Sequence, residues 1–481
     1  MTVHTGDSRA ADFRAADFQA GWRTVLTGAA DTPLVLLGNF EVENQWADGE
    51  IGLPHPGGTA TSAVVQRMDE LALLLGTARD VVVLKGRPDE EYLAYLAGLG
   101  FGIPRVLTPQ PADPARTVTG DVLADRDLMA TLARLAPAGY RLAPHGVSES
   151  EERLSARSGV PLAAPPAVLC KRVNSKVYSR DVATEYGLPQ PPGRACRTLG
   201  DLADAFAWAR RTIATGRPVV VKDAFGVSGK GLLVVHDSRR LDQLWRLIGR
   251  SAEGAGHDRV ALVVEEWVAR RMDLNYQFTV CRDGSVRLDF VKEAITAHGV
   301  HLGHRFPVAL HTDHLAQLID AAEVLGHRLA ADGYFGVAGA DAMVDDAGRL
   351  YPVVEVNARN NMSTYQAALH GGVVYPGAVA MARHFPVRPP APVPFGMLRR
   401  VLGDTLLRPG DRRGLVVTAA ATVNAAFDGG SSGTGGDGRL YGVLIAGSWP
   451  ELEALEECVT DRLRCPEIGG RSRAPQMEMA R

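Results

Sequence analysis

The segment YPVVEVNARNN, residues 351–361, carries three polar side chains at alternate positions after an apolar run. Glu355, Asn357 and Arg359 are two residues apart, and alternate residues of an extended strand point to the same face. That face would present a carboxylate, an amide oxygen and a guanidinium. The two oxygen groups suit Mg²⁺, and a guanidinium stabilises developing negative charge. The plainer interpretation is a strand edge with surface ion pairs, so other residues must decide.

A second acid is expected beside this trio. The segment GYFGVAGADAMVDDAGRLYPVVEVNARNN, which starts at residue 333, reads as a strand, a polar turn and a returning strand. Pairing of these strands brings Asp341 close to Glu355 and Asn357. Pro352 indicates an edge strand or a bulge. Three oxygen ligands without histidine or cysteine favour Mg²⁺ bridged to nucleotide phosphates.

A glycine-rich loop lies between two apolar runs in RPVVVKDAFGVSGKGLLVV, residues 217–235. It is not a Walker A loop, because Lys230 is followed by Gly231 and a strand-like run rather than by Ser or Thr and a helix. The pattern predicts a β-hairpin whose backbone amides approach phosphate closely. Lys222 ends the incoming strand and would add a point charge. A flexible hairpin with an incidental lysine is the structural alternative.

Lysine is rare in this chain. Six lysines stand against 46 arginines, at positions 85, 171, 176, 222, 230 and 292. Arginine can supply most of the surface charge, so a lysine in this chain indicates a position that requires a compact ammonium, as beside a phosphate. This raises the functional interest of each lysine without deciding any of them.

The elements that must position these residues are α/β in pattern. Buried strands (TPLVLLGNF, ARDVVVLKG) flank a helical segment, which predicts a parallel sheet. A second α/β region runs from about 171 to 385, and PVRPPAPVP, 386–394, reads as a stiff linker. GNFEVENQW, 38–46, follows the first strand, where α/β folds often bind ligands, although a packing turn explains it equally well.

Composition narrows the class. The 481 residues are 46% hydrophobic and 22% charged with a net charge of −3, as in a multidomain globular protein without a bias toward nucleic acid or membrane. The polar start has no signal-peptide core, and no apolar run reaches membrane-spanning length. The five cysteines lack metal or redox spacing, so a cytoplasmic location is expected.

The ordered motifs resemble the ATP-grasp superfamily of carboxylate ligases. The order is Lys176 in NSKVYSR, Lys222 with GVSGKG, the VEEWV strand at 264–268, and then the Asp341 hairpin. HLGHRFP, 301–307, resembles the Gly-His-x-x-Pro signature of the amino-acid ligase branch. The flanking regions look like those of peptide and carrier-protein ligases in actinobacterial natural-product pathways.

The resemblance implies an α/β ATP-grasp fold: an N-terminal parallel α/β domain, a glycine-loop lid and a central antiparallel-sheet domain, with a small C-terminal α/β cap. The expected parts are a polar N-terminal arm at 1–30, a pre-ATP-grasp domain at 31–170, a lid subdomain at 171–268, a metal and substrate subdomain at 269–385, and the cap at 395–481. The cap contains a glycine tract, 429–438, which is interpreted as a mobile loop or one that closes over a ligand.

The resemblance also implies a nucleotide site. Lys176 and Lys222 would contact ATP phosphates under a lid formed by residues 226–231. Residues 265–268 would flank the adenine, and Asp273 would meet the ribose at a position where many relatives have glutamate. The implied set is Lys176, Lys222, Gly226, Ser228, Gly229, Gly231, Glu265, Glu266, Trp267, Val268 and Asp273.

Magnesium would be held by Asp341, Glu355 and Asn357 in such an enzyme. Arg359 and Lys222 would be the catalytic residues, with Arg359 stabilising the acyl phosphate or the transferring phosphoryl group. ATP and Mg²⁺ are therefore the expected cofactors.

His301, His304 and Arg305 are the candidate substrate residues. With His298 the histidines form H-x-x-H-x-x-H, which lacks the two-plus-two grouping usual in structural zinc sites. A substrate-pocket loop is preferred, with His304 and Arg305 binding a carboxylate. Many amino-acid ligases have glutamate where His301 stands, which leaves recognition of an amino group open.

The function expected from these features is ATP-dependent joining of a carboxylate, an amino acid or related acid, to an amine. Transfer to a carrier-protein thiol, a phosphoryl-transfer kinase and a silent nucleotide-binding module are the alternatives. Expected partners are small-molecule acid and amine substrates, with a carrier protein and a homo-oligomer left open. No role with nucleic acid or membrane is expected.

Overall fold

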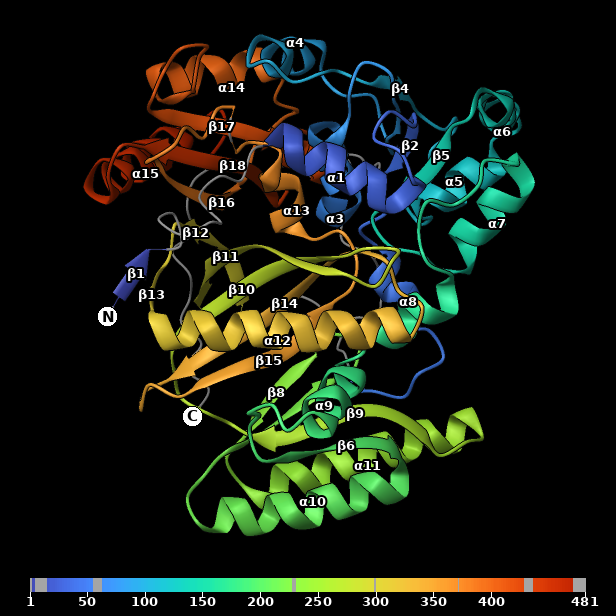
Figure 1. The fold of residues 1–481 in the computed structure, drawn as a ribbon, viewed down its shortest axis with the longest axis vertical. Coiled ribbons are helices and arrows are strands. Elements are labelled where there is room, and N and C mark those ends of the chain that lie inside the picture. The colour runs from blue at the N-terminus through green and yellow to red at the C-terminus, as the bar shows by residue number, and fades with distance from the viewer. Residues whose placement is uncertain are drawn as a thin grey trace.

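The computed structural model describes residues 2–4, 15–54, 63–226, 231–297, 300–370, 372–427 and 436–469. These residues form three sheets of four, four and eight strands and one two-stranded pair. In Figure 1 the parallel sheet lies at the upper right, the eight-stranded sheet runs through the middle to the upper left, and a smaller lobe lies at the bottom. Among the described residues, none of the helices is both long and apolar enough to span a membrane.

The N-terminal domain contains a four-stranded parallel sheet in the order β4-β3-β2-β5. Leu34 and Leu36 lie in one apolar cluster and Val35 and Leu37 in another, so both faces of this sheet are covered. The predicted parallel sheet is confirmed. Its strands are β2 (Leu34–Leu37), β3 (Val81–Val83), β4 (Arg105–Leu107) and β5 (Arg141–Pro144).

Short helices connect these strands. The helical segment expected between the first two strands is, within the described residues, a short α-helix followed by a 3₁₀ segment. The helices are α2 (Val42–Ala47), α3 (Ala63–Arg67), η2 (Met68–Leu75), α4 (Glu90–Gly98), α5 (Val118–Ala124), α6 (Arg126–Leu135), η3 (Ala136–Ala138), α7 (Glu149–Ser158) and α8 (Ala167–Val173).

The small lobe is a four-stranded antiparallel sheet in the order β6-β9-β7-β8. Its strands are β6 (Gly193–Thr198), β7 (Val219–Asp223), β8 (Leu232–Val235) and β9 (Arg259–Glu266). Its helices are α9 (Lys176–Glu185), α10 (Leu199–Ala214) and α11 (Ser238–Ala255), of which α10 and α11 form the outer layer in Figure 1. Strands β7 and β8 pair as antiparallel neighbours, which confirms the β-hairpin predicted on either side of the glycine-rich loop.

The eight-stranded sheet is antiparallel throughout, in the order β15-β14-β10-β11-β12-β16-β18-β17. Strand β15 is an edge strand that contains Pro352, and the β14–β15 register shifts beside Asp341, as proline in a strand indicates. Helix α12 (Thr312–Ala331) packs Leu318, Leu325 and Leu329 against one face. The five consecutive strands from β15 to β12 are β10 (Arg270–Val280), β11 (Val286–Ala297), β12 (Val300–Phe306), β14 (Gly336–Asp345) and β15 (Leu350–Asn357). Helix α13 (Met362–Ala367) follows β15.

The C-terminal region shares this sheet. Strands β17 and β18 pair with each other, and β18 pairs with β16, so the strands expected in a separate cap extend the central sheet. The elements are β16 (Val379–Val387), α14 (Phe395–Leu402), η4 (Gly403–Thr405), β17 (Gly414–Ala419), η5 (Ala421–Phe427), β18 (Gly438–Ala446) and α15 (Trp449–Leu463). Most of the glycine tract lies outside the described residues.

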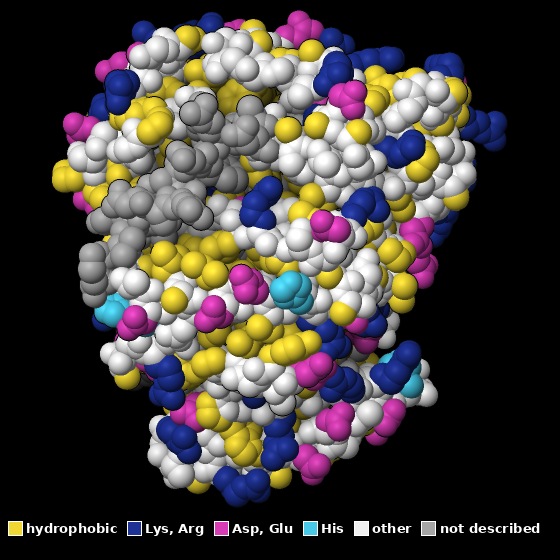
Figure 2. All heavy atoms as spheres, viewed as in Figure 1, with side chains coloured by type: hydrophobic (Ala, Val, Ile, Leu, Met, Phe, Trp, Pro, Cys, Tyr) yellow, Lys and Arg dark blue, Asp and Glu magenta, His cyan; other side chains and the backbone are white. Residues whose placement is uncertain are grey.

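The N-terminal segment contains more structure than the expected polar arm. Helix α1 (Ala15–Thr27) buries Phe18 and Trp22, which are four residues apart and therefore share one helix face. Strand β1 (Thr2–His4) pairs with β13 (Ala309–His311). Figure 2 shows acidic and basic side chains interspersed over one face of the molecule, in keeping with the small net charge.

Candidate active site

The β14–β15 hairpin brings the predicted metal ligands together. Asp341 is the direct cross-strand partner of Glu355, and Gly339 is the partner of Asn357. The Asn357 amide nitrogen lies 3.5 Å from Asp341 Oδ2, so the three side chains share one face. The sequence therefore predicted correctly that these residues converge.

The residues fit a divalent cation. Burial first, and the Glu355 carboxylate second, raise the pKa of Asp341 to about 7. Two acids held so close ionise together only when a cation offsets their charge. Lys176 supplies part of this positive charge, since its Nζ lies 2.7 Å from Glu355 Oε1. Within the described ranges no cluster of three or more histidine, cysteine, aspartate or glutamate side chains forms a metal site, so the set depends on the Asn357 amide.

Arg359 lies against this hairpin. Its Nη2 donates to Asn357 Oδ1 at 2.9 Å and forms an ion pair with Glu43, and its side chain is 13% exposed. Burial lowers the pKa of Arg359 to about 10, so the guanidinium remains charged at neutral pH. Glu43 belongs to α2 in the N-terminal domain, inside the GNFEVENQW segment. That segment therefore reaches the candidate site.

The two predicted phosphate lysines have different partners. Lys176 is the first residue of α9, and its Nζ donates to the Gly226 carbonyl at 2.7 Å as well as to Glu355. It thus joins the glycine hairpin to the metal pair. Lys222 forms a buried ion pair with Glu265, which also accepts from Arg180 Nη1 at 3.1 Å. Glu265 is therefore occupied by two cations.

The glycine loop is described at both ends. Gly231 has φ +79°, and a Cβ there would lie 2.5 Å from Asp223 Oδ2, so this position requires glycine. Gly226 accepts the Lys176 hydrogen bond. Ser228 and Gly229 lie outside the described residues.

The residues expected around the adenine and ribose lie at the end of β9 and the start of β10. Glu266 pairs with Arg217 at 2.9 Å, and the Trp267 amide donates to the Pro218 carbonyl at 2.9 Å. Val268 follows Trp267 in the connection to β10. Asp273 pairs with Arg270 at 3.0 Å and accepts from Thr296. A nucleotide contact at any of them stays a prediction.

A bulge in β12 brings two of the substrate candidates together. Ile295 pairs with Gly303 but Thr296 pairs with His301, so Leu302 is an extra residue in the strand. His301 and His304 therefore share a face, and their Nε2 atoms lie 3.2 Å apart. Burial lowers the pKa of His301 to about 4 and also lowers that of His304.

Arg305 lies apart from these histidines. As the neighbour of His304 in the strand it faces the other side of the sheet, where its guanidinium carbon is 5.7 Å from the Trp449 ring centroid. His298, the third member of the histidine pattern, lies outside the described residues.

Family models match two successive parts of the chain. Residues 68–160 match the Pre ATP-grasp domain, and residues 175–373 match the carbamoyl-phosphate synthase L chain, ATP binding domain. The second match contains the hairpin of Asp341 and Glu355, together with Lys176, Lys222 and Arg359. The chain belongs to the ATP-grasp superfamily. The predicted superfamily is thereby confirmed.

Relatives of this ATP-grasp protein include curated enzymes and solved structures. It is 26% identical over 304 residues to the butirosin acyl-carrier protein–L-glutamate ligase of Niallia circulans, which covers 63% of this chain and 66% of that protein. It is 28% identical over 149 residues to the biotin carboxylase of Pseudomonas aeruginosa, which covers 31% and 29%. These alignments span less than two thirds of each relative's length.

A solved structure supports the fold. N5-carboxyaminoimidazole synthetase from Staphylococcus aureus aligns with this ATP-grasp protein at a TM-score of 0.51 and 11% identity, covering 90% of this chain and 98% of that chain. At this identity the likeness shows the fold alone. The predicted ATP-grasp fold is confirmed.

Sequence reasoning missed some residues of the site. Asn275 on β10 donates to Asp341 Oδ1 at 2.8 Å, and Arg180 on α9 pairs with Glu265. Neither stands in a motif, because each is defined only by pairing between distant segments. Glu43 had a signal, since its segment follows a parallel strand. Lys292, on β11 beside Asn275, had only the rarity of lysine.

Proposed function

We propose that this protein is an ATP- and Mg²⁺-dependent, ADP-forming ligase that activates a carboxylate as an acyl phosphate and joins it to an amine. The observation that carries the proposal is the pairing of Asp341 with Glu355 beside Asn357 and Arg359. It gathers the charges that phosphoryl transfer needs at the end of the glycine hairpin. The proposed setting is cytoplasmic natural-product biosynthesis, as the sequence resemblance implies.

Five side chains of the site have roles in this proposal. Asp341, Glu355 and Asn357 would hold Mg²⁺, which when bound neutralises the phosphate oxygens of ATP. Lys176 links Glu355 to the Gly226 end of the glycine hairpin, so it would keep a hairpin that binds phosphate close to the metal side chains. Arg359, charged at neutral pH, would offset the charge on the transferring group.

The chemistry proceeds in two displacements. A carboxylate oxygen of the acid bonds to the γ-phosphorus while the bond to the β–γ bridging oxygen breaks, and ADP leaves. The amine nitrogen then bonds to the acyl carbon while the acyl C–O bond breaks. Phosphate leaves with that electron pair and takes up the proton that the amine loses.

A carrier-protein thiol is the second candidate acceptor. The observation that favours it is the similarity to a relative whose name specifies an acyl-carrier protein as acceptor. Activation is the same in both cases. Only the nucleophile that attacks the acyl carbon differs, sulfur in place of nitrogen.

A screen of ADP release tests the proposal. Amino acids and related acids are supplied with ATP and Mg²⁺, first alone, then with candidate amines, then with a carrier protein bearing its pantetheine thiol. The proposal expects ADP and phosphate in equal amounts with the cognate acid, and an amide or a thioester with the cognate acceptor. Formation of AMP and pyrophosphate, or hydrolysis of ATP that no acid stimulates, would contradict it.

A further inference from the structure

Lys292 is a buried lysine that the proposed mechanism does not use. The residue is 2% exposed, and its Nζ donates to Gln366 Oε1 at 3.1 Å and lies 4.5 Å from the Phe290 ring centroid. Both partners are uncharged. Among the residues that the structure describes, no carboxylate pairs with Lys292, and burial alone lowers its pKa to about 7. Burying an ammonium without a counter-ion destabilises the folded protein, so its presence indicates a functional role for Lys292.

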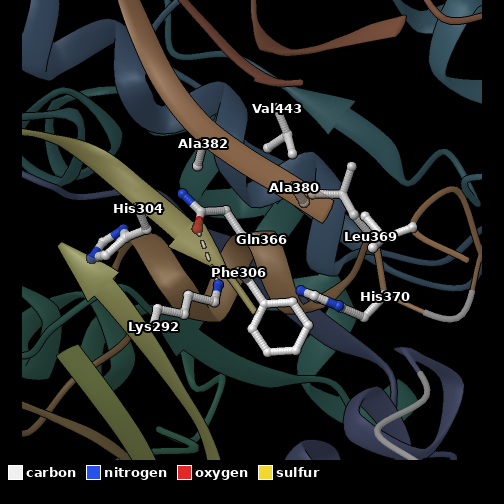
Figure 3. A pocket seen from close by; sticks show the side chains of 10 residues that line it. Lys292, His304, Phe306, Gln366, Leu369, His370, Ala380, Ala382 and Val443 are labelled. Atoms are coloured by element: carbon white, nitrogen blue, oxygen red, sulfur yellow. Dashed lines mark hydrogen bonds between the residues drawn. The ribbon is translucent and has the colours of Figure 1, made fainter. Parts of the chain in front are cut away.

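The Lys292 side chain lines a small cavity between the central sheet and the segment around α13. Figure 3 shows Lys292 directed at Gln366, with His304 on one side and Phe306 and His370 on the other. The free volume is about 10 Å³, which is room for one water-sized group. We call this space the Lys292 cavity.

The other titratable groups at the Lys292 cavity are neutral. His304 faces it from β12 and His370 from the turn after α13, and burial lowers the pKa of both, to about 3 for His370. Nδ1 of His304 is buried without a hydrogen-bond partner among the described residues. The cavity is therefore lined by a lysine that has no counter-ion among the described residues, which suits a small anion.

The register of the sheet places the Lys292 cavity beside the predicted metal site. Glu355, Asp341, Asn275 and Lys292 are successive cross-strand partners on β15, β14, β10 and β11. Residues paired in this way point to one face. Two strand spacings separate Asp341 from Lys292, so their backbones lie roughly 10 Å apart. That distance matches a small molecule which reaches from the metal pair to the cavity.

We propose that Lys292 binds a second carboxylate of the acid substrate, and that the enzyme acts on short dicarboxylic acids, dicarboxylic amino acids included. The inference rests on the proposed function, because the first carboxylate is the one activated beside Asp341 and Glu355. One carboxylate oxygen matches the cavity in size and Lys292 in charge. A monocarboxylic acid leaves the ammonium uncompensated.

Binding to the full-length protein tests this without turnover. Three pairs of ligands are titrated calorimetrically with ADP and Mg²⁺ present: succinate and succinamate, L-aspartate and L-asparagine, and L-glutamate and L-glutamine. Each pair differs only by replacing one carboxylate with an amide. In at least one pair the diacid should bind about 30-fold more tightly, as expected for a hydrogen bond to a charged group.

The variant Lys292→Met removes the charge and keeps the length of the side chain. It should bind the diacid and the amide with nearly equal affinity, and its affinity for the amide should match that of the wild type. Lys171→Met is the matched control, since Lys171 lies on α8 and pairs with Glu50 at 2.7 Å, away from the cavity. It should keep the full preference. Circular dichroism verifies that both variants fold.

Proton uptake separates a binding role from a structural one. At pH 8 the free Lys292 is mostly neutral and becomes charged when a carboxylate binds, so about one proton is taken up in the wild type. At pH 6 it is already charged, and uptake should fall toward zero. Equal affinity for every acid and its amide in the wild type, or an undiminished preference in Lys292→Met, would overturn the inference. The ADP screen fails or succeeds independently, because these titrations need no catalysis.

Discussion

Buried charged groups are paired with one another in the small lobe, whereas on the central sheet they lack a full counter-charge. In the lobe, Glu265 lies between Lys222 and Arg180, so its charge is neutralised by residues of the same region. On the central sheet, burial raises the pKa of Asp341 to about 7 and lowers that of Lys292 to about 7. Buried charges that pair with one another stabilise the fold. Buried charges without a full counter-charge indicate a site where a ligand supplies it.

The largest expected effect is on the central sheet. Glu355→Gln should lower ADP release by about 10³-fold, because one anionic ligand is lost and the γ-phosphate is misplaced. A coupled assay at saturating Mg²⁺ measures it, with circular dichroism to verify folding. The matched control in the lobe is Asp242→Asn, which breaks an exposed ion pair with Arg210 and should leave turnover unchanged. Near-normal ADP release in Glu355→Gln would refute the metal assignment.

In the lobe the expected effect is on stability. Glu265→Gln leaves Lys222 and Arg180 buried without their counter-ion, and breaking such a pair costs about 3 kcal/mol. Urea denaturation should show a lower midpoint with an unchanged slope. The exposed pair of Asp242 should cost under about 0.5 kcal/mol when broken by Asp242→Asn. If the two variants unfolded at the same urea concentration, the lobe would not depend on its internal pairing.

Removing Lys292, which has no counter-ion among the described residues, should raise the free energy of unfolding rather than lower it. Lys292→Met should raise the free energy of unfolding by about 2 kcal/mol at pH 6, because the folded protein no longer buries an uncompensated ammonium. The folded pKa of Lys292, about 7, lies below that of a free lysine. The wild type therefore gains stability as the pH rises from 7 toward 10, and the difference between the two proteins should shrink. A difference that is constant between pH 6 and 10 would mean that Lys292 does not titrate in this way.

The smallest expected effect concerns the contact between Glu43 in the N-terminal domain and Arg359 beside the β14–β15 hairpin. Glu43→Gln keeps the shape of the partner of Arg359 but removes its charge, so the guanidinium is held less firmly, by Asn357 and the Asn360 carbonyl. Turnover should fall about fivefold, with most of the change in kcat, since a single charge-assisted contact is weakened. An unchanged kcat would show that Glu43 does not position Arg359.

The features that could be predicted from the sequence are those made by neighbouring segments. The Asp341 and Glu355 hairpin, the glycine hairpin after Lys222 and the alternation of Glu355 and Asn357 all depend on strand geometry and nearby turns, whereas Arg359 lies in a bend after β15 ends at Asn357. Such contacts are fixed by the period of the side chains and by turn residues.

The features that could not be predicted depend on pairing at long range. Glu43 meets Arg359 across 316 residues, and no local pattern links them. The segment interpreted as a loop is strand β12, and the extra residue Leu302 in it brings His301 beside His304. The C-terminal strands join the central sheet through the pairing of β18 with β16, which no local sequence pattern indicates.

The acyl-phosphate mechanism is tested by following the oxygen atoms of the acid. A cognate acid labelled with a heavy oxygen isotope in the activated carboxylate is turned over with ATP, Mg²⁺ and acceptor, and the products are analysed by mass spectrometry. Formation of an acyl phosphate predicts that one labelled oxygen appears in inorganic phosphate, with ADP as the nucleotide product. Label in AMP, or unlabelled phosphate after turnover, would contradict the account.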